Sequence, residues 1–402
     1  MFRRHLLIAA TGFSLLALGS AALNLVVDPF WSFHGRDLFG LAEHRSQGSR
    51  AGKAEMLARG GHDVIILGSS RAEMGLDPAD PSWGGASVYN ASLAGTNLLE
   101  TRCVYDHVLA HGGPRLVLLC ADLLAFSSRR ATSADFDTSL FNPELNALSY
   151  YCLSLIGYRS THESFRALMR CSGAEARRVT WRNGHVRAVT ASAGHHRRWF
   201  TNTIRRFSRD RQTYRGFRFG QDRVAAMRHI AESCRRRNVR LIIVISPVHA
   251  MQLETIRIMG LWGDFERMKR EVVRAADDAN ALESTAPPVA AWDFTGFRGP
   301  LTESVPQDHE KDRAMKWFGD SSHFTPRLGS VVIARVLGAA EGPDDGGGFG
   351  FQLTRENLAG HLAGVRSDRE AYAAGHPGEI EWIRRMLDEA RGRDRAAGAR
   401  RP

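Results

Sequence analysis

The sequence has few lysines, few cysteines and a single long apolar run. Only four of its 54 basic residues are lysine, and the arginine-rich balance gives a formal charge of +11 and a pI near 9.9. This charge favours a polyanionic partner such as nucleic acid, anionic lipid or acidic polysaccharide, although GC-rich coding produces the same composition. The hydrophobic share of 43% and the charged share of 24% exclude a wholly disordered chain and a collagen-like repeat.

The five cysteines form no recognisable metal or redox motif. They contain no C-x-x-C pair, which excludes a zinc ribbon and a thioredoxin motif, and one disulfide remains open in an oxidising compartment. His162-Glu163 lacks the second histidine of H-E-x-x-H, and His195-His196 has no partner at metal spacing. The glycines at 346–348 lack the Gly-Lys-Ser/Thr of a phosphate loop. We therefore expect no metal and no cofactor.

The long apolar run begins the chain. It covers residues 6–27 behind two arginines and is long enough to cross about 30 Å of hydrocarbon. Small residues at 19–22 would also suit a signal peptidase, but the run continues beyond them for longer than a usual signal core. Residues 1–30 are therefore predicted to be an uncleaved, single-pass anchor, with a cleaved signal peptide as the alternative. The positive flank predicts an inner-membrane protein with a cytoplasmic N-terminus and a periplasmic domain, which argues against nucleic acid as a partner.

Short apolar runs that end in turns alternate with helical patterns in the exported part. Strands are predicted at 63–67, 87–90, 115–120, 240–245 and 289–294, and helices at 98–109, 222–237, 264–282 and 325–337. This alternation predicts an α/β fold with a parallel central sheet and helices on both faces.

Two segments depart from this rhythm. Residues from about 127 to 220 are expected to form an insertion or cap over the sheet edge. Asp344 to Gly348 is expected to be a hinge, followed by helices at 357–374 and 379–390 and a disordered end at 392–402. The predicted organisation is an anchor at 1–30, an α/β domain at 31–340, and a C-terminal helical appendage with its tail at 341–402.

Polar residues that could act together follow the first and last predicted strands. Ser69 and Ser70 come directly after the first strand, and active sites of parallel sheets lie at the carboxyl ends of strands. The next helix would aim free N–H groups at the same place, which suits a developing oxyanion. The alternative is that both serines only cap that helix. Asp320 and His323 share one loop, where the carboxylate could orient the imidazole as the base for a serine nucleophile.

These motifs resemble the SGNH (GDSL-type) hydrolase superfamily. The resemblance is carried by Gly-Ser-Ser at 68–70, by Gly95 after the second strand, and by Asp320-x-x-His323. It is strongest for the membrane-anchored, exported branch that includes the alginate O-acetylation proteins and the DltD-like proteins. The resemblance covers roughly residues 60 to 130 and 240 to 340 of the chain. It implies a three-layer α/β/α flavodoxin-like fold, with Ser70 as nucleophile, His323 as general base and Asp320 as its orienting acid.

The resemblance also implies an oxyanion hole. The Gly95 N–H would join the Ser70 N–H there, and the third family block would supply an asparagine after the third strand. This sequence has Asp122 at that position, which can donate a hydrogen bond only when protonated. Arg71 and His249 are two further cleft candidates. Arg71 would either bind an anionic or carbonyl group or fix the loop by pairing with a carboxylate. His249 would either line the cleft or be an ordinary loop histidine.

The α/β-hydrolase fold is the nearest rival, because Gly68-x-Ser70-x-Ala72 approaches the G-x-S-x-G elbow. That elbow normally follows several strands, and its acid and histidine lie on separate loops, so the SGNH interpretation is preferred.

The expected function is a membrane-anchored periplasmic serine acyl-ester enzyme, an O-acyltransferase or esterase acting on cell-envelope or exported polysaccharide. The expected partners are a polysaccharide or other hydroxyl acceptor and a membrane acyl-donor protein. The alternative is a catalytically inactive SGNH-fold protein that binds polysaccharide or scaffolds an envelope assembly complex.

Overall fold

The computed structural model describes residues 2–34, 40–173, 179–188, 195–310, 312–338 and 348–398. Contacts divide the chain into two compact units. The first consists of Met1–Gly60, Asp106–Gly112 and Ser133–Val189, and the second of Gly61–Tyr105, Gly113–Thr132 and Thr190–Pro402.

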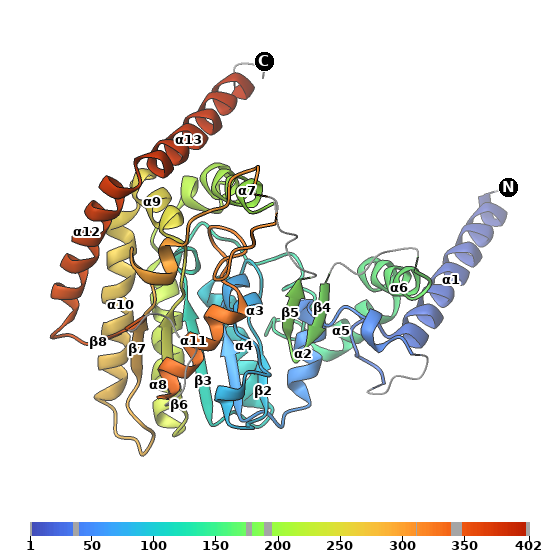
Figure 1. Cartoon of the computed structure of the whole chain (residues 1–402). Helices are drawn as coiled ribbons and strands as arrows, with labels where there is room; N and C mark the ends of the chain where they lie inside the picture. Colours follow the sequence, from blue (N-terminus) through green and yellow to red (C-terminus); the bar gives the residue numbers. More distant parts are fainter. Residues whose placement is uncertain are drawn as a thin grey trace. The chain divides into compact units, whose positions relative to one another are not determined.

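The first unit is mostly helical (Figure 1). Its main elements are α1 (Phe2–Val27), α2 (Arg50–Ala58), α5 (Ala147–Ile156), α6 (Tyr158–Cys171) and a hairpin of β4 (Val179–Arg182) and β5 (His185–Ala188). Helix α1 has a mean hydropathy of 2.0 and is the one helix among the described residues that is long and apolar enough to cross a membrane. The predicted N-terminal apolar helix is therefore confirmed.

Asp28 ends α1. Its backbone takes a left-handed φ of +47°, and its buried carboxylate accepts backbone N–H groups from Ser32 at 2.7 Å and His34 at 3.0 Å. These bonds turn the chain sharply after Val27.

The second unit contains a six-stranded sheet in the order β2-β1-β3-β6-β7-β8. The strands are β1 (Val64–Leu67), β2 (Val88–Asn90), β3 (Leu116–Ala121), β6 (Arg240–Ile245), β7 (Ala290–Asp293) and β8 (Phe351–Leu353). The first five are parallel, and β8 runs antiparallel to β7. The five predicted strands and the mostly parallel sheet are confirmed.

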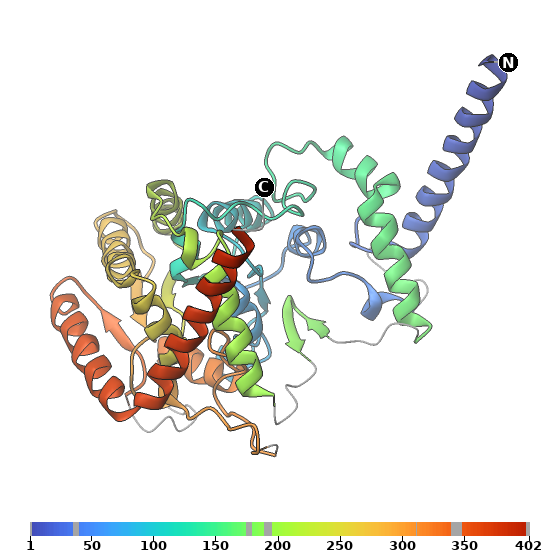
Figure 2. The same ribbon diagram turned by 90° about the horizontal axis from the view of Figure 1, so that it is seen from above.

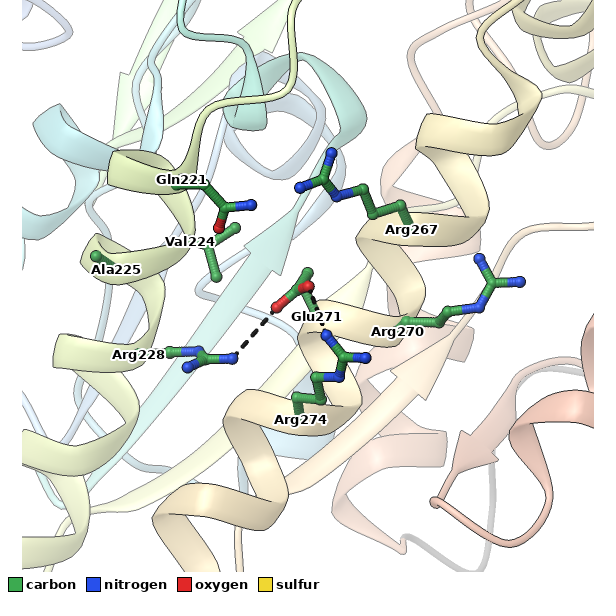
Figure 3. A pocket seen from close by; sticks show the side chains of 8 residues that line it. All are labelled: Gln221, Val224, Ala225, Arg228, Arg267, Arg270, Glu271 and Arg274. Atoms are coloured by element: carbon green, nitrogen blue, oxygen red, sulfur yellow. Dashed lines mark hydrogen bonds and ion pairs between the residues drawn. The ribbon is translucent and has the colours of Figure 1, made fainter.

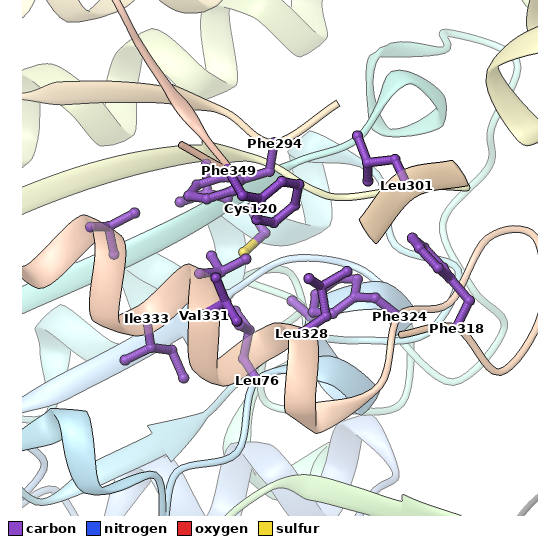
Figure 4. Close-up of a cluster of buried hydrophobic side chains, with 14 of the residues drawn as sticks. Leu76, Cys120, Phe294, Leu301, Phe318, Phe324, Leu328, Val331, Ile333 and Phe349 are labelled. Carbon is purple, nitrogen blue, oxygen red and sulfur yellow. The ribbon is translucent and has the colours of Figure 1, made fainter. Parts of the chain in front are cut away.

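Both faces of the sheet are buried. The helices of this part of the chain are α3 (Ser70–Gly75), α4 (Leu98–Ala110), α7 (His196–Arg209), α8 (Gln221–Arg236), α9 (Ala250–Ile258), α10 (Trp262–Asn280), α11 (Pro326–Leu337), α12 (Leu358–Gly375) and α13 (Pro377–Gly398). Ile66 and Leu118 join Leu328 of α11 in one apolar cluster, part of which is drawn in Figure 4. Ile65 and Val117 alternate with them, so they point to the opposite face, and both are equally buried.

The two ends of the segment expected as an insertion lie side by side in the sheet unit. Ser127 and Phe219 form an isolated antiparallel bridge there. Its middle, Ser133–Val189, groups with the first unit, whereas α7 groups with the second. The segment is thus shared between both units, which its weak apolar pattern did not indicate.

The expected C-terminal appendage is instead integrated into the sheet unit. Strand β8 adds an edge to the sheet, and Ile383 and Met386 of α13 belong to the core cluster. A three-residue strand is too short to leave a recognisable period in the sequence. Helix α13 extends to Gly398, into the segment expected to be disordered. Of the expected hinge at residues 344–348, only Gly348 lies within the described residues.

A buried ion pair ties α10 and α12 to the end of β7. Lys269 Nζ lies 2.6 Å from Asp293 Oδ2, and His361 Nε2 lies 2.8 Å from the same oxygen. Burial alone would raise the pKa of Asp293, but Lys269 and His361 outweigh it and hold that pKa far below its usual range.

Lys269→Met should therefore destabilise the protein. The substitution removes the cation and leaves the buried Asp293 carboxylate without its lysine partner, which costs about 3–5 kcal/mol. Because the pKa of Asp293 lies below its unfolded value of about 3.9, the pair contributes fully above that pH and its contribution is lost as pH falls further. The variant should thus lose less stability on acidification than the wild type does. Urea unfolding at several pH values measures both effects.

Lys316→Met is the matched control, because Lys316 is exposed, and the loss of its contact with the Trp317 ring should change the unfolding free energy by no more than about 1 kcal/mol. Equal unfolding midpoints for Lys269→Met and the control at neutral pH would contradict the assignment.

Candidate functional site

Ser70 stands at the carboxyl edge of the parallel sheet. Strand β1 ends at Leu67, and Ser70 is the first residue of α3. Ser69 is the N-cap of that helix, and its hydroxyl accepts the Arg71 N–H at 3.3 Å. Ser69 thus has the capping role, which leaves the Ser70 hydroxyl available for another partner.

The structure brings Ser70, His323 and Asp320 together. Ser70 Oγ lies 2.9 Å from His323 Nε2, and His323 Nδ1 lies 2.8 Å from Asp320 Oδ2. This is the order and reach of a nucleophile, its base and the acid that orients the base. The pattern D-x-x-H in the sequence therefore corresponds to a real contact.

The local fold around Asp320 keeps its carboxylate ionised. Asp320 Oδ1 accepts the backbone N–H of Ser322 at 2.7 Å and of His323 at 3.0 Å. Burial would raise the pKa of Asp320, but His323 and these two N–H groups lower it below its usual value. An anionic Asp320 favours the proton on Nδ1 of His323, so that Nε2 can accept the Ser70 proton.

Close packing at Gly75 fixes the histidine loop against α3. Phe318 and Phe324 form a β-bridge that closes this loop. A Cβ on Gly75 would stand 2.0 Å from the Phe324 ring, so only glycine allows this approach. Phe324 follows His323 directly, and the packing therefore sets the distance between the base and the helix that carries Ser70.

The expected oxyanion glycine lies in the loop between β2 and α4. Gly95 has a φ of +73°, and its carbonyl accepts Arg130 Nε at 2.7 Å. A Cβ on Gly95 would lie 3.4 Å from the other end of that guanidinium. Arg130 therefore stands beside Gly95. Sequence reasoning missed this residue, because it begins the segment in which no pattern could be recognised.

Asp122 and Arg71 form a buried ion pair. Arg71 NH1 lies 2.8 Å from Asp122 Oδ1, and Asp122 Oδ2 accepts the Ser69 hydroxyl. Arg71 Nε also donates to the carbonyl and the hydroxyl of Ser322, both at 3.1 Å. Arg71 thus takes the second of its two expected roles, fixing the loop through a carboxylate. Asp122 acts here as an acceptor, and it holds Arg71 and Ser69 instead of donating to an oxyanion.

A second series of hydrogen bonds between polar side chains supports the histidine loop. Ser321 Oγ donates to Gln252 Oε1 at 2.7 Å, and Gln252 Nε2 donates to Tyr214 Oη at 2.7 Å. Burial raises the pKa of Tyr214, although the adjacent Arg71 opposes this effect. Neither Tyr214 nor Gln252 belongs to a motif, so the sequence carried no signal for them.

Of the two roles expected for His249, the structure does not support the first, because this residue does not line an open cleft. Its side chain is fully buried, Nδ1 accepts the Met251 N–H at 3.2 Å, and Nε2 donates to the Glu303 carbonyl at 2.7 Å. Burial lowers the pKa of His249 to about 4. Since both ring nitrogens are engaged, His249 is a structural cap of α9.

An arginine-lined pocket lies between α8 and α10 (Figure 3). None of the three triad residues, Ser70, His323 and Asp320, lines it. It has a volume of about 550 Å³ and is lined by Gln221, Val224, Ala225, Arg228, Arg267, Arg270, Glu271 and Arg274. Glu271 is its one carboxylate and pairs with Arg228 at 3.3 Å and Arg274 at 3.0 Å. Four arginines and one carboxylate thus line the pocket, although Arg270 also pairs with Glu266 at 3.0 Å and Arg228 with Asp278 at 3.6 Å.

No group of three or more His, Cys, Asp or Glu side chains suited to a metal ion occurs in the part of the chain that the structure describes. No protein-family model and no curated protein sequence matches this chain. The site is therefore interpreted from its own geometry.

Arg71→Met should destabilise the protein by about 3–5 kcal/mol, because it leaves the Asp122 carboxylate buried without its cation. The double variant Arg71→Met/Asp122→Asn should recover much of this loss, since it also removes the uncompensated charge. Thermal unfolding of the wild type, both single variants and the double variant measures the coupling. Additive losses would show that the two groups do not stabilise one another.

Proposed function

We propose that this chain is a membrane-anchored serine acyl-ester enzyme of the SGNH type. The observation that carries the proposal is the continuous contact from Ser70 Oγ through His323 to an Asp320 carboxylate. The order of the five parallel strands supports it as well: numbered along the chain they stand 2-1-3-4-5, the flavodoxin-like order, with the triad at their carboxyl edge.

The proposed reaction uses Ser70 as a covalent carrier. Ser70 Oγ attacks the carbonyl carbon of an acyl ester while His323 Nε2 takes its proton. The resulting oxyanion is held by the Ser70 and Gly95 N–H groups, with the positive charge of Arg130 beside Gly95 in place of the missing asparagine. The carbon–oxygen bond to the leaving alcohol then breaks, and that alcohol receives the proton from His323.

In the second half-reaction an acceptor hydroxyl replaces the leaving alcohol. His323 removes its proton, the acceptor oxygen attacks the acyl-Ser70 carbonyl, and Ser70 regains the proton as the ester transfers. The acceptor is a sugar hydroxyl of a cell-envelope or exported polysaccharide in the transferase, and water in the esterase. Transfer is favoured because an enzyme anchored at the inner membrane and facing the periplasm would meet a polysaccharide there, with a membrane acyl-donor protein as its supplier.

Ser70→Ala should abolish both acetate release from an activated ester and covalent labelling by a fluorophosphonate probe, because both need the Ser70 oxygen. Ser69→Ala is the matched control: it removes the neighbouring hydroxyl and weakens the cap of α3, yet it should retain labelling. His323→Ala should label far more slowly than the wild type. Equal ester turnover by the wild type and Ser70→Ala would remove Ser70 from the mechanism.

Asp320→Asn tests the orienting acid without changing the shape of the loop. The amide oxygen can still accept the two backbone N–H groups, but its NH₂ group would donate to Nδ1 of His323 and force the proton onto Nε2. Nε2 then cannot accept the Ser70 proton, so kcat should fall by roughly 10³–10⁴-fold. The thermal midpoint should stay near that of the wild type. Wild-type kcat in this variant would contradict the role of Asp320.

The second candidate function is an inactive SGNH-fold protein that binds polysaccharide or scaffolds an assembly complex. The arginine-lined pocket favours it, because it offers a positive surface suited to an acidic glycan away from the triad. Asp122 at the position of the family asparagine favours it too. This candidate predicts no fluorophosphonate labelling of the wild type.

A further inference from the structure

Helices α5 and α6 bury small polar residues and expose bulky apolar ones. Ser154, Ser160 and Ser164 are buried, whereas bulky apolar side chains point outward. The outward set is Leu148, Tyr151, Leu153, Ile156, Tyr158, Phe165, Leu168 and Met169, with exposed fractions from 39% to 85%. A helix that packs on a water-soluble core shows the opposite arrangement.

The buried side of this helical pair is joined to α1 by hydrogen bonds between polar side chains. Asn24 Nδ2 donates to the Leu155 carbonyl at 2.7 Å and to Thr161 Oγ1 at 3.0 Å. Ser164 Oγ donates to Asn24 Oδ1 at 2.8 Å. Small residues and internal polar contacts between helices, with large apolar residues outside, are the packing of membrane proteins.

The depth of this pair follows from where it meets α1. The apolar run of α1 covers residues 6–27, and its partly or fully buried positions all lie between Ala17 and Val27. Val27 and Leu23 pack with Ala167 of α6, and Figures 1 and 2 both show α5 and α6 beside this end of α1. Residues 17–27 span about 16 Å, which is one leaflet of a core about 30 Å thick.

We infer that α5 and α6 form a helical pair embedded in the membrane, in the leaflet where the C-terminal end of α1 emerges, with lipid as the partner of its exposed apolar face. The inference rests on α1 being the membrane anchor of the proposed function, because helices that pack along the last half of a span share its depth. At 10 and 14 residues, neither helix can cross the bilayer.

The polar residues of α6 agree with a position at the lipid headgroups. Arg159 and Arg166 are about half-exposed, and Tyr151 and Tyr158 lie among the outward residues. Tyrosine and long basic side chains are the groups that settle at this interface.

Fluorescence quenching in the full-length protein tests the inference. The protein is reconstituted into phosphatidylcholine/phosphatidylglycerol nanodiscs with or without nitroxide-labelled lipid, and an environment-sensitive dye is attached to one cysteine at a time. Cys152, on the outward side of α5, is a native attachment site for the dye. The substitutions Cys103→Ser and Cys171→Ser remove the two other cysteines that are not buried. Cys120 and Cys234 can remain, because both are buried and burial raises the pKa of each thiol.

Three further reporters, placed in a background that also carries Cys152→Ser, complete the design. Phe165→Cys reports on α6, Leu16→Cys on the middle of α1, and Glu283→Cys is the water reference, since Glu283 is exposed in the second unit. We expect Cys152 and Phe165→Cys to show at least about half of the quenching seen at Leu16→Cys, with the strongest effect from nitroxides near the headgroup. Glu283→Cys should not respond.

The outcomes separate the two claims. Quenching at Leu16→Cys without quenching at Cys152 and Phe165→Cys would leave the anchor intact and overturn the embedded helical pair. An absence of quenching at Leu16→Cys would overturn both. Reporters on α5 and α6 that are shielded from lipid nitroxide and from an aqueous quencher alike would identify a protein occupant, a second copy included, and would also overturn the lipid assignment.

Discussion

The site depends on the buried guanidinium of Arg71. This one group joins three parts of the second unit: α3, where Arg71 follows Ser70; the end of β3, through Asp122; and the histidine loop, through Ser322. A planar guanidinium can satisfy several acceptors in fixed directions at once, which a lysine cannot do. Because burial of an unpaired charge is costly, Arg71 and Asp122 hold each other in place, and the position of Ser70 relative to His323 follows from that constraint.

The sheet and the triad could be predicted from the sequence because each leaves a local signal. A strand buried on both faces, such as β3, is a continuous apolar run, and the turn that ends β1 is marked by its serines. Asp320 and His323 lie three residues apart on one loop, so their contact is local as well. Only the contact of His323 with Ser70 is long-range, and it follows from the rule that active sites gather at the carboxyl ends of parallel strands.

The supporting residues could not be predicted, because their roles are defined only by tertiary contacts. Tyr214 and Gln252 belong to no motif. Gln252 nevertheless accepts a hydrogen bond from the loop that carries His323, and Tyr214 accepts one from Gln252. Arg130 reaches Gly95 from a segment without recognisable periodicity. Asp122 could be located from the sequence, but its role depends on a cation that comes from another element. The role of a carboxylate in a sequence stays open until its partner is known.

The two units differ in what their helical patterns mean. In α11 the apolar positions are buried, among them Leu328, Val332 and Ile333. In α5 and α6 the same reading would place Leu148 and Phe165 inside, whereas Ser154 and Ser164 are the buried residues. A periodic pattern tells which residues share a face but not which solvent that face meets. The missing information is the position of α1. Asn24 of α1 is hydrogen-bonded to the buried side of α5 and α6, so their apolar faces point away from α1. Apolar faces of this kind favour contact with a partner other than water.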